Sequence, residues 1–341
     1  MQSLPVFPYL YDVKTIRFLL LLALLCCAPA VSAGQYYALI VSGGRSRLMN
    51  HERYWNDCAF LYRTLRHDCH VPQRNITLLM SDGDDPSPDM LRTGATGFAS
   101  SPTDLDGDGQ PDLSLSATRQ NLSATMRQLA EELTTDDHLF IYMIDHGEVD
   151  AAGNACLWLW GDEQLLPAEL SAMLAPLQVA SMTILLGHCY AGAFVPSLQG
   201  YGRIVIAACA ADELSWSCPD RPYDEFVYHF TCALAQHDEQ GVPVASDSDG
   251  DGCVTMSEAF DYARRHDRRP ESPCIWAWPQ QLADEWSFGG VTLGLPHTVA
   301  RTASPVVYDL LGRRYFGPGV NVRVSANGKA LLRVQTSPNP S

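Results

Sequence analysis

The chain has 341 residues, of which 46% are hydrophobic and 18% are charged, a composition that suits one sizeable globular domain with terminal extras. Its formal net charge is −16, from 39 acidic and 23 basic residues. This balance carries no basic footprint for nucleic acid or for anionic lipid, so neither is expected as a partner. Several acidic residues gather in short Asp-rich loops, which points to calcium instead.

The first 33 residues are predicted to be a signal peptide. Basic residues precede an apolar run at 18–27, and a small-residue tripeptide ends at Ala33, after which cleavage is expected. The apolar run is about half of the ~20 residues that a membrane-spanning helix needs, so no membrane span is expected in the mature chain. A lipoprotein signal at Cys26 or Cys27 is the alternative.

Cysteine usage agrees with export. The chain has 11 cysteines, and two of them lie in the predicted signal peptide. The remaining number is odd, which in an exported protein leaves at least one thiol unpaired. Up to four disulfides are therefore expected, together with one free and reactive thiol.

Strands and helices alternate along the chain. Continuous apolar runs predict strands at 35–42, 75–81, 137–145, 155–161, 180–187 and 202–209. Helical periodicity predicts helices at 50–67, 117–133 and 167–177, and a segment rich in Asp, Gly, Pro and Ser predicts loop over most of 82–112. Because the strands are apolar on both faces, we expect an α/β fold with a mainly parallel sheet that helices cover on both sides.

A histidine and a cysteine each follow a buried strand. His146 comes directly after the strand at 137–145, and Cys189 comes just after the strand at 180–187. Functional groups of such sheets collect beyond the carboxyl ends of the strands. An imidazole there can lower the pKa of a thiol and later protonate a leaving amine. The backbone N–H groups of Gly147 and Cys189 are the natural donors to an oxyanion. Packing roles for both side chains are the alternative.

Four segments of the sequence resemble the legumain family of the caspase-like clan of cysteine peptidases. They read YALIVSGG…N..RYWNDC..LY, DHLFIYMIDHG, TILLGHCYAG and RIVIAACAADELSW, in that order, over about residues 35–235. The resemblance implies a caspase-like three-layer sandwich and a cysteine endopeptidase that acts on peptide or protein substrates. It implies Cys189 as nucleophile, His146 as acid and base, and Gly147 in the oxyanion hole. His188 is expected near the cleft rim, and not as a second base.

The same resemblance implies a substrate pocket that reads an Asn side chain. Arg53, Ser215 and Asp224 match the positions that line it, where a cation and an acid can meet the two ends of an amide. Two positions depart from the family pattern, because Gly187 replaces an acid and Tyr190 replaces a glutamate. Cleavage after Asn or Asp is therefore predicted, and a surface ion pair between Arg53 and Asp224 is the alternative.

Two Asp-rich loops predict structural calcium, and no organic cofactor is expected. The loop at 247–258 fits the EF-hand pattern of oxygen ligands around one cation, with expected ligands Asp247, Asp249, Asp251, Cys253, Thr255 and Glu258. The other loop begins in the same way but has Leu115 in place of the terminal glutamate, and its expected ligands are Asp104, Asp106, Asp108 and Asp112. Solvated acidic loops are the alternative.

A peptidase domain is predicted at 34–295 and a small β module at 296–341. The module has alternating runs joined by Gly-Pro-Gly and Asn-Gly turns. Its YDLLGRR and NGK motifs resemble the C-terminal sorting domain of type IX secretion. This resemblance implies the secretion machinery as a partner, export through the periplasm of a Gram-negative bacterium, and a secreted or cell-surface location.

Three functions remain open from the sequence. They are an endopeptidase, a peptidyl ligase that uses the same acyl-enzyme, and a non-catalytic calcium-binding surface protein on a peptidase-like fold. The last function requires that Cys189 be in a disulfide or that His146 point away from it.

Overall fold

The computed structural model describes residues 34–94, 96–113, 115–150 and 152–289, together with short strands at 307–308, 314–315, 320–324 and 330–334. Contacts divide the chain into two compact units, Met1–Val291 and Thr292–Ser341. The predicted signal peptide and the predicted domain boundary at 295 lie outside the described residues.

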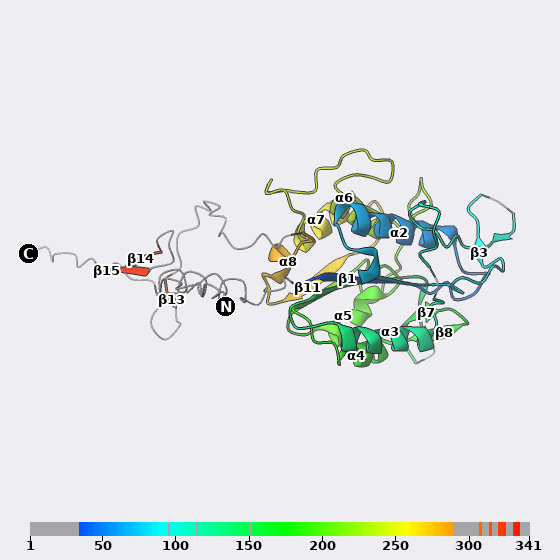
Figure 1. Ribbon diagram of the computed structural model, residues 1–341, viewed down its shortest axis with the longest axis horizontal. Helices are drawn as coiled ribbons and strands as arrows, with labels where there is room; N and C mark the ends of the chain where they lie inside the picture. The colour runs from blue at the N-terminus through cyan, green and yellow to red at the C-terminus, as the bar shows by residue number, and fades with distance from the viewer. Residues whose placement is uncertain are drawn as a thin grey trace, which may run out of the picture. The chain divides into compact units, whose positions relative to one another are not determined.

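A six-stranded sheet forms the centre of the first unit (Figure 1). Its order is β11-β10-β9-β5-β1-β2, and its pairs are parallel except for the antiparallel edge pair of β10 with β11. The strands are β1 (Tyr36–Ser42), β2 (Ile76–Met80), β5 (His138–Ile144), β9 (Ser181–Leu186), β10 (Arg203–Ala207) and β11 (Cys274–Trp278).

Helices cover both faces of this sheet (Figure 1). One face carries α2 (Glu52–Arg63), α6 (Glu225–Ala235) and α7 (Met256–His266), and the other carries α3 (Arg119–Glu132), α4 (Pro167–Leu174) and α5 (Val195–Leu198). Three layers with a mainly parallel central sheet confirm the predicted α/β class and agree with the caspase-like architecture.

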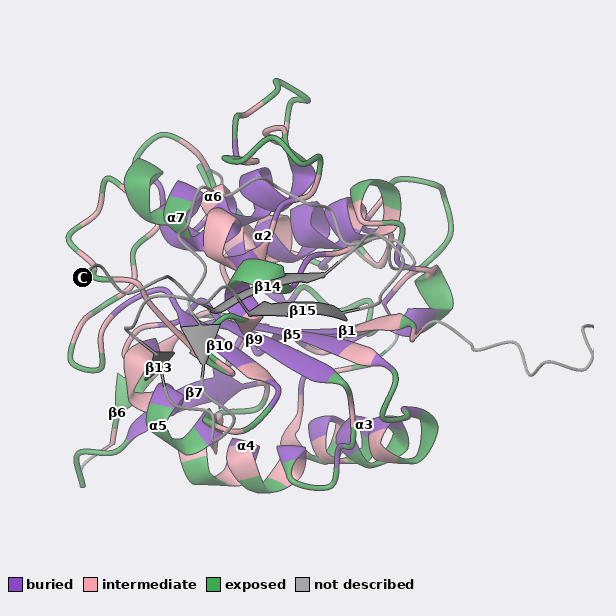
Figure 2. Ribbon diagram, turned by 90° about the vertical axis from the view of Figure 1, so that its left-hand side faces the viewer, coloured by how far each residue is buried: buried purple, intermediate pink, exposed green. Residues whose placement is uncertain are grey.

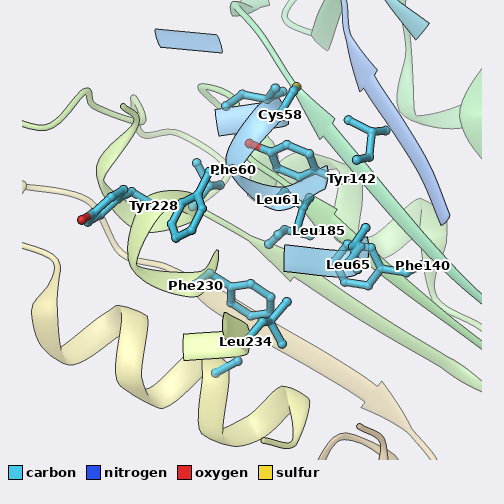
Figure 3. Close-up of a cluster of buried hydrophobic side chains, with 14 of the residues drawn as sticks. Cys58, Phe60, Leu61, Leu65, Phe140, Tyr142, Leu185, Tyr228, Phe230 and Leu234 are labelled. Carbon is cyan, nitrogen blue, oxygen red and sulfur yellow. The ribbon is translucent and has the colours of Figure 1, made fainter. Parts of the chain in front are cut away.

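The sheet separates two hydrophobic cores, and its strands other than the edge strand β11 are buried along most of their length (Figure 2). Successive side chains of a strand point to opposite faces, so Leu39 packs in the core on the α3 side and Ile40 in the core on the α2 side. In the core on the α2 side, Phe140 and Tyr142 of β5 meet side chains of α2 and α6, including Phe230 (Figure 3). Burial on both faces explains why these strands are mostly apolar.

Shorter elements lie in the connections. They are the π-helix Thr64–Asp68, the 3₁₀-helices Gln73–Asn75 and Ala191–Phe194, α8 (Leu282–Glu285), the pair β3 (Met90–Leu91) and β4 (Phe98–Ala99), and the sheet of β6 (Gly147–Val149), β7 (Ala155–Leu159) and β8 (Glu163–Leu165). The segment 82–112 is largely loop, as predicted. Within the described part of the chain, none of the helices has the length and apolar character needed to cross a membrane.

The disulfides expected from the cysteine count do not form in this structure. All nine cysteines between residues 34 and 289 are unpaired, and five of them are buried: Cys58, Cys156, Cys209, Cys218 and Cys232. Buried free cysteines behave as small apolar side chains. The buried cysteines therefore contribute to core packing in this structure and do not form a disulfide framework.

The second unit contains two antiparallel strand pairs, β12 (Val307–Tyr308) with β13 (Arg314–Tyr315), and β14 (Val320–Val324) with β15 (Ala330–Val334). The other residues of the predicted β module at 296–341 lie outside the described part of the chain.

Candidate active site

Neighbouring parallel strands bring His146 and Cys189 to the same edge of the sheet. In the pairing of β5 with β9, Met143 lies opposite Leu186. His146 and Cys189 each come three residues after these partners, so the two loops leave the sheet side by side. The resulting proximity follows from register alone, as the sequence predicted from the strand ends.

Gly147 touches the backbone of the Cys189 loop. A Cβ atom on Gly147 would lie 1.9 Å from the carbonyl oxygen of Cys189 and 2.9 Å from Nδ1 of His188, so no side chain fits there. Hydrogen bonding with the backbone of Gly147 also lowers the pKa of the Cys189 thiol. Within the described residues, the N–H of Cys189 itself donates to no other group. The N–H groups of Gly147 and Cys189 are therefore both available to donate to an oxyanion beside the thiol.

The His146 ring is held by a carbonyl and two aromatic rings. Its Nε2 lies 3.1 Å from the carbonyl oxygen of Met49, and the rings of His51 and Tyr54 stand edge-on with centroids 5.4 Å away. Because a carbonyl only accepts, Nε2 carries the hydrogen of the neutral ring and Nδ1 keeps the lone pair. Burial, followed by the positive charge of Arg53, lowers the pKa of His146 below its ordinary value.

The Cys189 thiol donates to the carbonyl oxygen of Ser215, with an S···O distance of 3.5 Å. Burial raises the pKa of this thiol above its ordinary value, and hydrogen bonding with the backbone of Ser215 and Gly147 lowers it only in part. At neutral pH, both the thiol and the His146 imidazole are therefore neutral. The arrangement suits a base that removes the thiol proton during attack, and not a preformed ion pair.

Asp145 fixes the start of the histidine loop by hydrogen bonds to the backbone, a role that the sequence did not indicate. Its side chain is buried and accepts hydrogen bonds from the backbone N–H groups of His146, at 2.5 Å, and of Gly44. Burial raises the pKa of this carboxyl to about 7, although both backbone donors lower it. A carboxylate in this position ties β5 to the loop after β1.

His188 lies under the nucleophile loop and not at the cleft rim, which corrects the sequence-based expectation. The side chain is 1% exposed, its Nδ1 lies 2.9 Å from the carbonyl oxygen of Cys189, and its ring meets Phe194 edge-on. Burial lowers its pKa to about 4, so the ring is neutral. Its ring packs against Phe194 of the 3₁₀-helix that follows Tyr190, which accounts for its burial.

Residues 114–266 match the model of the Peptidase C13 family. The matched segment contains His146, Gly147, Cys189, Ser215 and Asp224, and it covers less than half of the chain. It supports a cysteine peptidase in the general sense, with a peptide or protein as substrate. A comparison with curated proteins gives no match.

Arg53, on α2 and outside the Peptidase C13 match, pairs with Asp224 inside it. Nε of Arg53 lies 3.0 Å from Oδ1 of Asp224, and the two side chains are 22% and 8% exposed. The pair is thus largely buried, which corrects the alternative of a surface ion pair. Asp57, a second acid that the sequence analysis missed, accepts from the N–H of Asp224 at 3.1 Å, and its pKa is raised by burial and by Asp224.

A cleft of about 540 Å³ opens beside this pair. Arg53 lines it, whereas Asp224 and Ser215 do not, and the other lining residues are His51, Thr93, Ser217, Cys218, Pro219, Asp220, Arg221 and Pro222. Asp220 is bound by Arg268 and Arg221, which lower its pKa to about 2. The lining thus contains two arginines and one acid, and each arginine is also ion-paired, Arg53 with Asp224 and Arg221 with Asp220 and Glu239.

Gly187 and Tyr190 are the two positions where the chain departs from the legumain pattern, and the structure gives a reason for the first. A Cβ atom on Gly187 would lie 2.8 Å from Cγ1 of Val227, so α6 occupies the space that an acidic side chain would need. Tyr190 has a φ of 62°, in the left-handed region that few residues other than glycine adopt. Its N–H donates to the carbonyl of Glu213 at 2.8 Å, which fixes the turn after the nucleophile.

The loop at 247–258 folds so that carboxylates converge. Ligand atoms of Asp247, Asp249 and Glu258 lie within 4.8 Å of one another. Asp247 accepts from the N–H groups of Gly250 at 2.7 Å and Gly252 at 2.9 Å. Asp251 and Cys253 do not belong to that group, whereas the Thr255 hydroxyl lies 3.0 Å from Oε2 of Glu258 and so adjoins it.

The loop at 104–112 repeats this geometry. Ligand atoms of Asp104, Asp106 and Asp108 lie within 4.8 Å of one another. Asp104 accepts from the N–H groups of Gly107 at 2.7 Å and Gly109 at 2.9 Å, the same distances as in the other loop. Asp112 turns away, because its oxygens accept from the Tyr62 hydroxyl at 2.5 Å and from the Leu105 N–H at 2.8 Å. Nη1 of Arg66 lies 3.2 Å from Asp106 and offsets part of its charge.

Proposed function

We propose that the protein is a secreted cysteine endopeptidase that uses Cys189 and His146. The supporting observation is the paired ends of β5 and β9, which place the histidine loop against the nucleophile loop inside the Peptidase C13 match. A non-catalytic surface protein required either Cys189 in a disulfide or a His146 that points away from it. The unpaired Cys189 thiol therefore favours an enzyme.

The reaction begins with attack of the Cys189 sulfur on the carbonyl carbon of the scissile peptide bond, while the thiol proton passes to Nδ1 of His146. The carbonyl oxygen becomes negatively charged and meets the N–H groups of Gly147 and Cys189. Breakage of the C–N bond releases the amine with the proton from His146 and leaves a thioester on Cys189. Water, deprotonated by His146, then cleaves the thioester and restores the thiol.

Cleavage after Asn or Asp is the proposed specificity. Asp224 is already in an ion pair with Arg53, so the negative charge of Asp224 attracts a basic substrate side chain only weakly. The cleft beside the pair is lined by two arginines, and its acid Asp220 is itself bound by arginines. A side chain that ends in a carbonyl or carboxylate oxygen is therefore favoured over Lys or Arg.

Turnover of a peptide library by the wild-type chain tests this function. Cys189→Ala and His146→Ala should each lower kcat/KM by roughly a thousandfold or more, because the two groups act as one unit. Matched peptides that differ only at the residue before the cut then report specificity. Near wild-type turnover by Cys189→Ala would refute the assignment, and a preference for Lys or Arg would refute the proposed pocket.

An added amine nucleophile separates a hydrolase from a ligase. Both activities share the thioester, and they differ in whether water or an amine resolves it. Products joined to the added amine, detected by mass spectrometry, would identify a ligase.

Calcium and export complete the proposal. The loops at 104–112 and 247–258 would each hold one Ca²⁺ through their converging carboxylates, which would stiffen the loops and take no part in the reaction. Residues 1–33 would direct export to the periplasm of a Gram-negative bacterium, and residues 296–341 would engage its type IX secretion machinery. The protein would then be released or held at the cell surface.

A further inference from the structure

An extended segment, Ser215–Ser217, forms one wall beside the nucleophile. The Ser215 carbonyl accepts from the Cys189 thiol, and the Trp216 carbonyl accepts from the N–H of Glu225 at 2.9 Å. The Trp216 side chain is a large apolar group that is 39% exposed, and Trp216 follows directly after the residue that the Cys189 thiol touches. This wall is therefore where the backbone of a bound peptide would pass.

A loop that follows α7 holds this wall at two points. Oε2 of Glu271 accepts from the N–H of Trp216 at 3.2 Å, and Nε of Arg269 donates to the Ser217 carbonyl at 2.7 Å. Both residues lie between the end of α7 and the start of β11. The loop thus acts as a clamp on the wall, and neither Glu271 nor Arg269 touches Cys189 by a hydrogen bond among the described residues.

Glu271 faces a second acid, Asp267, in this clamp. Oε1 of Glu271 and Oδ2 of Asp267 are both buried, and neither has a hydrogen-bond donor within the described part of the chain. A single proton shared between the two carboxyls would satisfy both atoms, because one oxygen then donates and the other accepts. The two orphaned atoms point to a carboxyl pair that carries one proton at neutral pH.

Groups around the pair agree with this protonation. Burial, followed by the charge of Asp267, raises the pKa of Glu271 to about 9, and burial raises that of Asp267. Ser215 lowers the pKa of Glu271, whereas Arg269 lowers and Glu225 raises that of Asp267. Cys189, across the wall, has its pKa raised slightly further by Glu271.

We propose that Glu271 is a positioning residue that holds the Ser215–Ser217 wall for substrate binding, through a proton that it shares with Asp267. This inference rests on the proposed peptidase function. Below the pH at which the pair loses its proton, the clamp is closed. Above that pH, two neighbouring carboxylates repel each other and the N–H of Trp216 loses its fixed partner, so substrate binding weakens while the bond-breaking groups stay in place.

The test is the pH dependence of KM and kcat for the full chain with a peptide substrate. Wild-type KM should rise roughly three- to tenfold between pH 8 and 10, the worth of one hydrogen bond, with kcat changed less. Glu271→Gln should keep a low KM across this range, since the amide oxygen accepts from Trp216 and the NH₂ group donates to Asp267. Glu271→Ala should show the raised KM at every pH. Glu132→Gln, on the exposed face of α3, should follow the wild type.

A second measurement needs no turnover. Iodoacetamide alkylation of Cys189, followed by peptide mapping over pH 7 to 11, reports the midpoint of the thiol. The midpoint should be lower in Glu271→Gln than in the wild type, because ionised Glu271 opposes the thiolate. Coinciding midpoints, or a Glu271→Ala chain with wild-type KM at all pH values, would overturn the positioning role. A wild type that alkylates as expected but cuts no peptide would instead refute the peptidase function alone.

Discussion

Cys189 and His146 enter the proposed reaction as two neutral groups. Both side chains are largely withdrawn from solvent, and burial disfavours the charged form of each. The sequence suggested an imidazole that lowers the thiol pKa. The structure instead places Nε2 of His146 on the Met49 carbonyl and leaves Nδ1 to act as a base during attack.

The lowered pKa of His146 predicts the acid limb of activity. A base works only when it is unprotonated, so kcat/KM should fall as the pH drops through the pKa of His146. That pKa lies below the ordinary value of 6.5. A profile of kcat/KM against pH with an Asn peptide, whose side chain does not titrate, should therefore have its acid midpoint below 6.5. A midpoint above 6.5 would contradict the burial of the ring.

Gly187 provides a test of packing behind the nucleophile. Gly187→Ala should destabilise the fold by about 1–3 kcal/mol, because the new Cβ atom would lie 2.8 Å from Cγ1 of Val227. Val227→Ala should relieve this clash, so the double variant should lose less stability than the sum of the two single variants. Urea unfolding of the four chains measures the coupling. Additive losses would mean that Val227 does not occupy this space.

At the scale of elements, the sequence predicted those parts that carry their own local signal. All-apolar runs identified the parallel strands, and the polar residues directly after two of them identified His146 and Cys189. β11 was missed although its five residues, CIWAW, form a continuous apolar run, because Pro273 and Pro279 flank it and it is a partly exposed edge strand that pairs antiparallel. α6 was not singled out either, because it is apolar nearly all round.

Other parts of the site depend on contacts between distant segments, which no local pattern records. Asp57 on α2 meets Asp224 at the start of α6, and Glu271 meets Trp216 across 55 positions of sequence. Each looks like an ordinary charged residue in its own segment. The burial that raises the pKa values of Asp57 and Glu271 arises only when the layers pack.

Glu258 links the calcium loop to α7. Its side chain accepts from the N–H of Thr255 at 3.0 Å, while the Thr255 hydroxyl accepts from the N–H of Glu258 at 3.2 Å, a capping box that starts the helix. The same carboxylate belongs to the convergent group with Asp247 and Asp249. One residue thus sets both the helix start and the proposed cation site.

Glu258→Gln should separate these two roles. Glutamine keeps the capping box, so the melting temperature in EDTA should change little. Its neutral amide binds calcium poorly, so the rise in melting temperature with millimolar calcium should shrink. For the wild type, this rise corresponds to roughly 2.7 kcal/mol when calcium is about 100 times Kd. Glu132→Gln, on the exposed face of α3 and outside both loops, is the matched control and should keep the wild-type calcium shift. An equal calcium shift in wild type and Glu258→Gln would argue against a cation at this loop.

At the scale of the whole molecule, the first unit closes its own core well before residue 292. β11 completes the sheet by pairing with β10 from Arg203 to Ala207, and Trp286 is 5% exposed and packs in the core with α7. The N–H of Met256 also donates to the Trp286 carbonyl at 3.0 Å, which ties this end of the unit to the start of α7. Residues up to 288 are therefore structural parts of the peptidase unit.

Truncation after residue 291 should consequently leave a stable and active peptidase unit. Its melting temperature and kcat/KM should match those of the full chain, because the strands and apolar side chains that form the two cores are all retained. Truncation after residue 273 is the control, since it removes β11 and Trp286, exposes the β10 edge and should abolish cooperative unfolding. If residues 296–341 act as a sorting module, the longer truncation product should also stay in the periplasm when cell fractions are compared. A large drop in melting temperature after truncation at 291 would mean that the second unit contributes to the stability of the first.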